Sequence, residues 1–378
     1  DIMGARRQEQ IEILDRNLRQ MEIKKKYTFN NANGKSHYMI IKTGNDQEED
    51  VEILVGKGKI TRASEYKYLG NWIDERGTVE RQISEVENKS KGMISEAKKI
   101  ASGKNIGNMG TSALLLIYEK TIIPVITYNL EVWSNWQQKN WQAIEKVQAK
   151  ALKQIFNLPK TTPYWGLLCE LGMWNMKSRI VYKRMMLLQS ISRSADNRIG
   201  KEIIEDQKHR ETDQCWYSQV CEEGEEYKLP VQDVGKYTKS EWKKLVKSKI
   251  MKNIVNESII KRRQMKKLEI LKNQKYERQS YLNYTSVTEV TDIIKTKLHM
   301  WDIGRNMGGN RDCIGCTREV DGISHIIHCQ ELKKIGMEGN KQWIEQSTLE
   351  NIQKMTKFIK RYVEKRDEKD EMECNMEK

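Results

Sequence analysis

Three cysteines and two histidines lie within a short segment of the sequence. They are Cys313, Cys316, His325, His328 and Cys329. A Cys-x2-Cys turn brings two thiolates within about 4 Å of each other, which is what a tetrahedral Zn²⁺ site with Zn–S bonds of ~2.3 Å requires. Gly315 suits the tight turn between Cys313 and Cys316, because it lacks a side chain. This spacing is typical of the first half of a zinc site.

The second half of the site would come from a helix. His325 and Cys329 are four residues apart, so on a helix they share one face. His328 is expected to lie beside the ligands or in solvent, because neighbouring helix positions point about 100° apart. The alternative is a set of buried free thiols next to a surface histidine. The spacing favours Zn²⁺ bound by Cys313, Cys316, His325 and Cys329.

A second feature is a strongly basic segment. Residues 239–278 contain 14 Lys or Arg and 4 Glu, a local net charge of +10. We expect these cations to bind the phosphates of a nucleic acid without reading its bases. The alternative is an ordinary solvated helix face. The candidate phosphate-binding residues are Lys243, Lys244, Lys247, Lys261, Arg262, Arg263, Lys266 and Lys267.

Other catalytic constellations are absent from the sequence as motifs. It contains no GxSxG, no Walker A loop and no HExxH. Asp1 and Lys35 carry no meaning when taken alone. The tryptophans at 133, 136, 141 and 174 are interpreted as core residues, although some could stack on bases.

Composition narrows the class of protein. The chain has 378 residues with a formal charge of +14, which favours nucleic acid or an anionic membrane as the large partner. Seven cysteines without a regular framework indicate a reducing, intracellular location, in the cytoplasm or nucleus. No window holds ~18 unbroken apolar residues and no signal peptide is present, so neither a membrane span nor secretion is expected. The sequence begins with Asp1, so the chain is expected to be part of a longer protein.

Periodicity predicts a mainly α-helical chain with a mixed N-terminal part. Short strands are expected at 27–29, 38–41, 51–55 and 66–73, after a helix at 5–24. Further helices are expected at 79–100, 114–133 with a kink at Pro124, 141–155, 181–191 and 290–302. An apolar stripe also runs through the basic segment after residue 239, and a charged helix closes the chain. Residues 208–240 show little periodicity and are interpreted as an irregular linker.

Several short motifs occur in a recognisable order. Residues 65–70 read Glu-Tyr-Lys-Tyr-Leu-Gly, and Tyr118, Pro124, Tyr128 and Trp133 follow. Leu158-Pro159, Thr162-Pro163 and Glu170-Leu171-Gly172 come next, and the Cys-rich segment closes the series. This order resembles the thumb and C-terminal part of non-LTR (LINE-type) retrotransposon reverse transcriptases, from about residue 1 to 345.

The resemblance implies roles for residues to which their spacing alone assigns no function. Asp1 resembles the second aspartate of a Tyr-x-Asp-Asp box that binds catalytic Mg²⁺, and Lys35 resembles the lysine of an Asn-x-x-Lys-Ser/Thr segment. Tyr68 is expected to contact nucleic acid. The first aspartate of the box is not in this sequence, so Mg²⁺ belongs to the complete polymerase only. We therefore expect the isolated chain to be catalytically inactive.

The resemblance also predicts an organisation. Residues 1–75 would be a palm remnant, 76–207 a helical thumb, 208–300 a linker with the basic helices, 301–345 a CCHC zinc knuckle and 346–378 a charged helix or tail. The partners would be RNA and DNA, with no membrane. Two other readings stay open: a host-retained, non-enzymatic zinc-dependent nucleic-acid-binding protein, and a structural helical scaffold.

Overall fold

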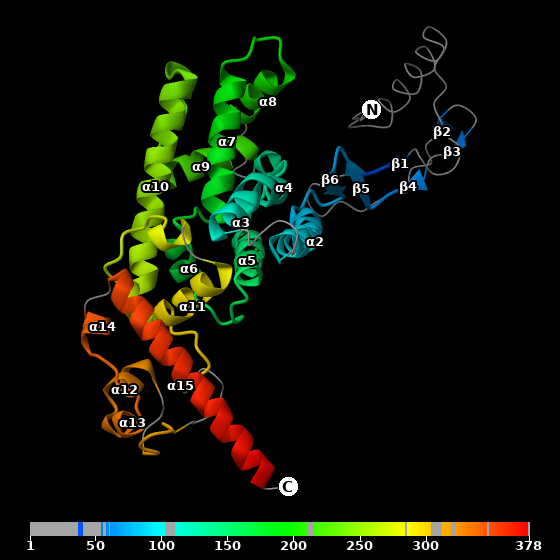
Figure 1. The fold of residues 1–378 in the computed structure, drawn as a ribbon. Helices are drawn as coiled ribbons and strands as arrows, with labels where there is room; N and C mark the ends of the chain where they lie inside the picture. The colour runs from blue at the N-terminus through cyan, green and yellow to red at the C-terminus, as the bar shows by residue number, and fades with distance from the viewer. Residues whose placement is uncertain are drawn as a thin grey trace. The chain divides into compact units, whose positions relative to one another are not determined.

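The protein is represented by a computed structural model (Figure 1). It describes residues 37–40, 54–55, 58–59, 61–102, 110–209, 215–283, 286–303, 312–318, 322–345 and 348–376. Helices dominate these residues and the strands are short, which confirms the mainly α prediction. The chain divides into two compact units, one comprising 1–84 with 133–136 and the other 85–132 with 137–378. The helix predicted at 5–24 and the strand at 27–29 lie outside the described residues.

The strands of the first unit form three pairs. The parallel pair is β1 (His37–Tyr38) with β4 (Thr61–Arg62). The antiparallel pairs are β2 (Leu54–Val55) with β3 (Gly58–Lys59), and β5 (Glu65–Tyr68) with β6 (Asn71–Asp74). The single strand predicted at 66–73 is therefore wrong. Leu69 and Gly70, with φ of 46° and 84°, make a tight hairpin turn in its middle, and glycine adopts such angles without strain.

Helices of the second unit follow in chain order. They are α2 (Glu80–Ser102), which begins in the first unit, α3 (Thr111–Ile117), α4 (Ile123–Ile126), α5 (Gln138–Ile155), α6 (Tyr164–Leu171), α7 (Met176–Ser192), α8 (Ile199–Lys208), α9 (Trp216–Glu226), α10 (Lys239–Arg263), α11 (Val287–Lys297), α12 (Ile323–His328), α13 (Gln330–Lys334), α14 (Gln342–Glu345) and α15 (Leu349–Met376). Short 3₁₀ segments lie at Leu130–Val132, Val231–Lys236, Lys266–Leu271 and Ser280–Asn283. The helices predicted from the apolar stripes at 79–100, 141–155 and 181–191 are confirmed.

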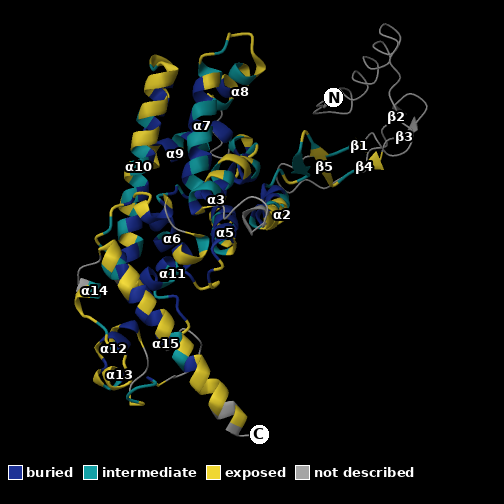
Figure 2. Cartoon of the chain, in the orientation of Figure 1, coloured by how far each residue is buried: buried dark blue, intermediate teal, exposed yellow. Residues whose placement is uncertain are grey.

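α7 is the central helix of this unit. It contacts α5, α9 and α10 along its length. α6 is largely buried, whereas exposed residues cover much of α10 and α15 (Figure 2). The basic α10 therefore has one side packed against the unit and another side open to solvent.

The helix predicted at 114–133 is shorter than expected. α3 passes into a π-helical turn, Tyr118–Ile122, and α4 then ends at Ile126. Pro124 lies at the start of α4, directly after this π-helical turn. Asn129, with φ of 53°, leaves the helical conformation soon after. The helix expected at 290–302 likewise ends early, as α11 stops at Lys297.

The irregular linker predicted at 208–240 is also wrong, because α9 lies within it. The acidic run Glu222–Glu226 hides the apolar side of this helix in the sequence. Trp216 and Val220 are buried, and Glu223 is buried with them because Arg184 of α7 donates to its carboxylate at 2.8 Å. Gly224 allows this packing, since a Cβ there would come within 2.1 Å of Val231.

A buried polar network joins α6, α11 and the segment between α10 and α11. Lys297 donates to Glu170 and Gln274 at 2.8 and 2.6 Å. Gln274 and Tyr281 also donate to the Glu170 carboxylate. Gly172 lets this segment approach closely, because a Cβ there would lie 2.3 Å from the backbone nitrogen of Arg278. The network fixes the wall on which α15 packs through α11.

Candidate metal centre and basic helix

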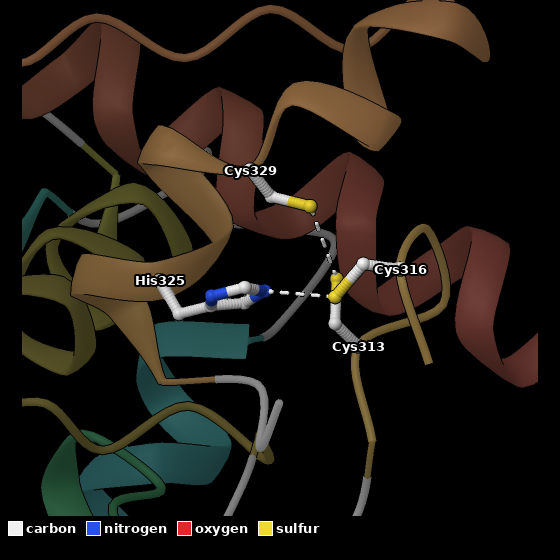
Figure 3. A group of neighbouring side chains, drawn as sticks. All are labelled: Cys313, Cys316, His325 and Cys329. Atoms are coloured by element: carbon white, nitrogen blue, oxygen red, sulfur yellow. Dashed lines mark hydrogen bonds between the residues drawn. The ribbon is translucent and has the colours of Figure 1, made fainter. Parts of the chain in front are cut away.

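The four side chains predicted as metal ligands lie together (Figure 3). One ligand atom from each of Cys313, Cys316, His325 and Cys329 lies within 4.8 Å of the others. The Sγ atoms of Cys313 and Cys329 are 3.8 Å apart, and Cys316 Sγ is 3.4 Å from His325 Nε2. The three cysteines are free thiols, so the cluster is not a disulfide. These residues could hold a metal ion.

Two of these distances are close to the edges of a small coordination tetrahedron. With bonds of ~2.3 Å to sulfur and ~2.0–2.1 Å to nitrogen, two sulfurs are separated by roughly 3.8 Å and a sulfur and a nitrogen by roughly 3.6 Å. The Cys313–Cys329 distance of 3.8 Å and the Cys316–His325 distance of 3.4 Å agree with those edges. The donor set leaves no position for a carboxylate, so the hard cations Ca²⁺ and Mg²⁺ do not fit it.

The turn that carries the first two cysteines is tightly organised. The Thr317 N–H donates to the Cys313 carbonyl at 2.9 Å, and Thr317 takes the left-handed φ of 51° that closes the turn. The N–H groups of Gly315 and Cys316 donate to the Cys313 sulfur, which stabilises its thiolate, while burial raises the pKa of this thiol overall. A Cβ on Gly315 would lie 2.9 Å from Leu332, so glycine lets the turn pack against α13.

The other two ligands come from α12 and its end. His325 lies within α12, but Cys329 is its C-cap with φ −66° and ψ 115°, so the two do not share a continuous helix as predicted. The chain turns at Cys329 and starts α13 at once, which still brings the sulfur into the cluster. His328 lies outside the cluster, exposed, with Nδ1 2.6 Å from the Ser324 carbonyl, as its helix position predicts.

α15 supports this turn from behind, a contact that the sequence analysis missed. The Ile314 N–H donates to the hydroxyl of Tyr362 at 3.1 Å. The Arg366 guanidinium donates to the Asp312 carbonyl and lies over the Tyr362 ring. Both side chains are buried, and they continue the apolar stripe of Ile352, Met355 and Ile359 at helical spacing. That stripe indicates a buried face of α15 from the sequence alone, but it does not reveal which loop packs against that face.

The basic helix α10 begins at a well-formed N-terminus. Thr238 and Glu241 form a reciprocal capping box. Buried residues then recur every fourth position, at Trp242, Val246, Ile250, Ile254, Ser258 and Arg262. A four-residue repeat advances about 40° per step on a helix of 3.6 residues per turn, so this buried line winds around α10. Its first part meets α7, where Trp242 donates to the Met185 carbonyl, and its last part meets the Lys266–Leu271 segment.

Because the buried line winds around α10, the predicted phosphate-binding residues differ in how far they are exposed to solvent. Lys243, Lys244 and Lys247 are exposed in the first half of α10. Lys239, Lys243 and Lys247 form a row parallel to the buried line, and none of these three has an ion pair within the described residues. Hydrogen bonds from the Thr238 backbone and hydroxyl lower the pKa of the Glu241 carboxyl, and the nearby charge of Lys244 lowers it further. The first half of α10 therefore presents a solvent-facing row of cations.

The second half of α10 differs, and the assignment of Arg262 to phosphate binding is wrong. Arg262 is only 1% exposed, and its guanidinium donates to the carbonyls of Leu271 and Gln274. Lys261 is half-buried, while Arg263 and Lys267 are exposed. The side chain of Lys266 lies outside the described residues, and half-buried Tyr68 belongs to the other unit. Arg263 lies 20 residues, or roughly 30 Å, along the helix from Lys243. Lys243 and Arg263 therefore lie near opposite ends of α10.

Three further expectations concern Asp1, Lys35 and the absence of a membrane-spanning helix. Asp1 and Lys35 lie outside the described residues. Among the helices of the described ranges, none combines the length and apolar character needed to cross a membrane. Comparisons of the chain with protein-family models, curated proteins and solved structures found no match.

Proposed function

We propose that the chain is the C-terminal part of a LINE-type reverse transcriptase and that it holds nucleic acid through phosphate contacts of α10. The row of Lys239, Lys243 and Lys247 carries this proposal, because three solvent-facing cations without an ion pair among the described residues favour a polyanionic partner. We base the proposed family on the order of the sequence motifs, and the proposed binding surface on the row of lysines on α10. The cysteine–histidine cluster supports the same assignment as a structural knuckle.

We propose Zn²⁺ as the metal of the cluster. Three cysteine sulfurs and one imidazole nitrogen within 4.8 Å of one another form a donor set that suits Zn²⁺. Because all four positions of the tetrahedron come from the protein, the ion would stabilise the fold and would not activate a water molecule. The residues that hold it are Cys313, Cys316, His325 and Cys329.

Metal content tests this site. Cys316→Ser and His325→Asn are expected to abolish stoichiometric zinc in the purified protein, since each removes one of four ligands. His328→Asn is the matched control, because it changes a histidine on the same helix that lies outside the cluster. Zinc that stays stoichiometric in Cys316→Ser, or that is absent from the unsubstituted protein, would refute the assignment.

Salt-dependent binding tests the nucleic-acid surface. Lys243→Gln with Lys247→Gln removes two exposed cations of α10 and is expected to reduce the slope of log K against log salt by about 1.8 on duplex, at ~0.9 per contact. Lys89→Gln with Lys91→Gln makes the same charge change on α2, where both lysines pair with glutamates, and is the control. Equal slopes for both double variants would refute the role of α10.

A polymerase assay distinguishes an inactive fragment of a reverse transcriptase from a chain that is an enzyme by itself. The isolated chain is expected to show no template-dependent nucleotide incorporation, because the resemblance assigns it only one metal-binding aspartate, Asp1, and two-metal catalysis needs a set of carboxylates. Incorporation above a matched blank preparation would contradict this. If the chain shows no salt-dependent binding to RNA or DNA at all, the structural scaffold is the better reading.

A further inference from the structure

A cleft lies directly beside the cysteine–histidine cluster. Its volume is about 540 Å³, within the range of clefts that hold small ligands. The side chains lining it include His328, Gln330, Lys333, Asn340, Lys341 and Trp343. They come from the end of α12, from α13, from the segment between α13 and α14, and from α14 itself, which contains Trp343. None of these residues is a ligand of the proposed zinc site.

The walls of the cleft are held in place by close contacts. A Cβ on Gly339 would lie 2.3 Å from the Ile327 carbonyl oxygen, so glycine lets this wall lie directly against the end of α12. Trp343 is half-exposed, and Phe358 of α15 holds its ring edge-on with centroids 5.8 Å apart. The indole is thus oriented by the protein while part of its surface lines the cleft.

The lining combines one aromatic surface with polar groups, two cations and one carboxylate, that of Glu338. An indole stacks on a nucleobase of any sequence. His328 Nδ1 carries its proton, because the Ser324 carbonyl 2.6 Å away can only accept. In the neutral ring Nε2 is then an acceptor, and Gln330 and Asn340 add amide donors and acceptors. Lys333 and Lys341 supply cations for a neighbouring phosphate, and Lys333 also pairs at 3.1 Å with Glu338, whose carboxylate lines the same cleft.

We propose that this cleft binds an unpaired nucleotide of a single-stranded nucleic acid, with the base on Trp343 and the flanking phosphate near Lys333 and Lys341. The proposal rests on the nucleic-acid-binding function above and assigns it a second surface, distinct from α10. A single strand fits better than a duplex, because only an unpaired base presents its face for stacking.

The cleft and the cysteine–histidine cluster share α12. His325 faces the cluster, while Ile327 and His328 line the cleft. Cys329 then ends the helix, and Gln330 lies in the cleft again. An ion at the cluster would therefore fix one wall of the cleft, so binding of a single strand is expected to weaken when the metal is removed.

The test measures binding of an unstructured RNA oligonucleotide of roughly eight nucleotides to the full chain by fluorescence anisotropy. Trp343→Ala is expected to weaken binding roughly tenfold, as the loss of one stacked base predicts. Lys333→Gln is expected to weaken it more than Lys334→Gln. Lys334 is the matched control, since it lies on the same helix, is exposed and pairs with Glu331 outside the cleft lining. A DNA oligonucleotide of the same sequence separates recognition of the base from recognition of the ribose.

Two further measurements show whether a loss of binding comes from the cleft or from misfolding. Zinc stoichiometry shows whether Trp343→Ala is still folded, and ultraviolet crosslinking of the unsubstituted protein is expected to label the peptide containing Trp343. If the oligonucleotide binds but the cleft variants match the Lys334→Gln control and crosslinks fall elsewhere, the cleft proposal is wrong while the function of α10 stands. If neither duplex nor single strand binds at low salt, both proposals fail.

Discussion

Arg262 and Arg263 are adjacent and carry equal charge, yet α10 places them in opposite surroundings. Arg262 is buried and donates to two backbone carbonyls that follow the helix, whereas Arg263 is exposed. A charged side chain is tolerated in the interior only when its donors have partners. Here Nη1 donates to the Leu271 and Gln274 carbonyls, and Nε donates to the Ser258 carbonyl. Arg262 thus acts as a structural link between α10 and the segment after it.

Single substitutions at these two positions should separate these roles. Arg262→Gln is expected to lower the free energy of unfolding by roughly 2–4 kcal/mol, because it leaves buried carbonyl oxygens without a donor. Arg263→Gln is expected to change it by less than about 0.5 kcal/mol. Urea unfolding of both variants measures the difference. Equal effects of the two substitutions would show that Arg262 is not held as described.

Glu223 makes folding depend on pH. Burial raises the pKa of its carboxyl from 4.5 to about 7, although Arg184 beside it acts in the opposite direction. A raised carboxyl pKa means that the folded state keeps the proton longer than the unfolded state. The stabilising contribution is therefore complete below pH 4.5 and is lost as the pH rises to about 7.

The corresponding measurement compares the unsubstituted protein with Glu223→Gln. Their difference in unfolding free energy is expected to change by at most about 3 kcal/mol between about pH 5 and about pH 8, with the glutamate protein losing stability relative to the variant. Terms common to both proteins cancel in this difference. A difference that stays constant across that range would contradict the raised pKa.

At the scale of elements, α6, α11 and the segment between α10 and α11 depend on one buried ion pair. Lys297 and Glu170 are 2.7 Å apart, with 8% and 0% of their side chains exposed. Removing one partner of a buried pair leaves an uncompensated charge, whereas removing both leaves none. The single and double substitutions should therefore differ in a definite order.

Lys297→Met is expected to destabilise the protein by about 3–5 kcal/mol, and Glu170→Gln added to it should recover part of that loss. Lys354→Met is the control, because the Lys354–Glu350 pair on α15 is exposed and such pairs contribute at most about 1 kcal/mol. Thermal or urea unfolding provides the measurement. A double variant less stable than Lys297→Met would show that the pair is not the source of the cost.

Periodic apolar stripes were sufficient to predict α2, α5 and α7, because their buried faces are built from side chains within the same helix. α9 was missed because Glu223 is compensated by Arg184, 39 residues away, and no local pattern shows such a partner. The hairpin of β5 and β6 was missed because strand-forming residues continue on both sides of Leu69 and Gly70. Arg262 could have been recognised, since it continues the four-residue repeat that begins at Trp242.

The grouping of the four candidate ligands followed from their spacing, because all of them lie within one short segment. Tyr362 and Arg366, which support that segment, come from the last helix and depend on tertiary packing. The cleft at Trp343 likewise requires Gly339 to approach the Ile327 carbonyl, a contact between backbones that leaves no mark in side-chain patterns. The sequence thus predicts local constellations better than the surfaces around them.

At the scale of the whole molecule, the proposed zinc site should stabilise the C-terminal part of the second unit more than its centre. Removing the metal with a chelator is expected to increase hydrogen exchange in α12, α13 and the Tyr362 region of α15, because the turn at Ile314 loses its anchor. α5 and α7 should keep their protection, since their core is built without the cluster. Added zinc should restore the original pattern. Uniform loss of protection across both groups of helices would contradict this division.

The hydrogen bond from Ile314 to Tyr362 also has a consequence for synthesis of the chain. These residues are 48 positions apart, so at ~5–20 residues per second the ribosome makes Tyr362 roughly 2–10 s after Ile314. All four candidate ligands, the last of which is Cys329, are translated before that helix position. If the cluster binds the proposed ion, the nascent chain can capture it before α15 docks onto this turn.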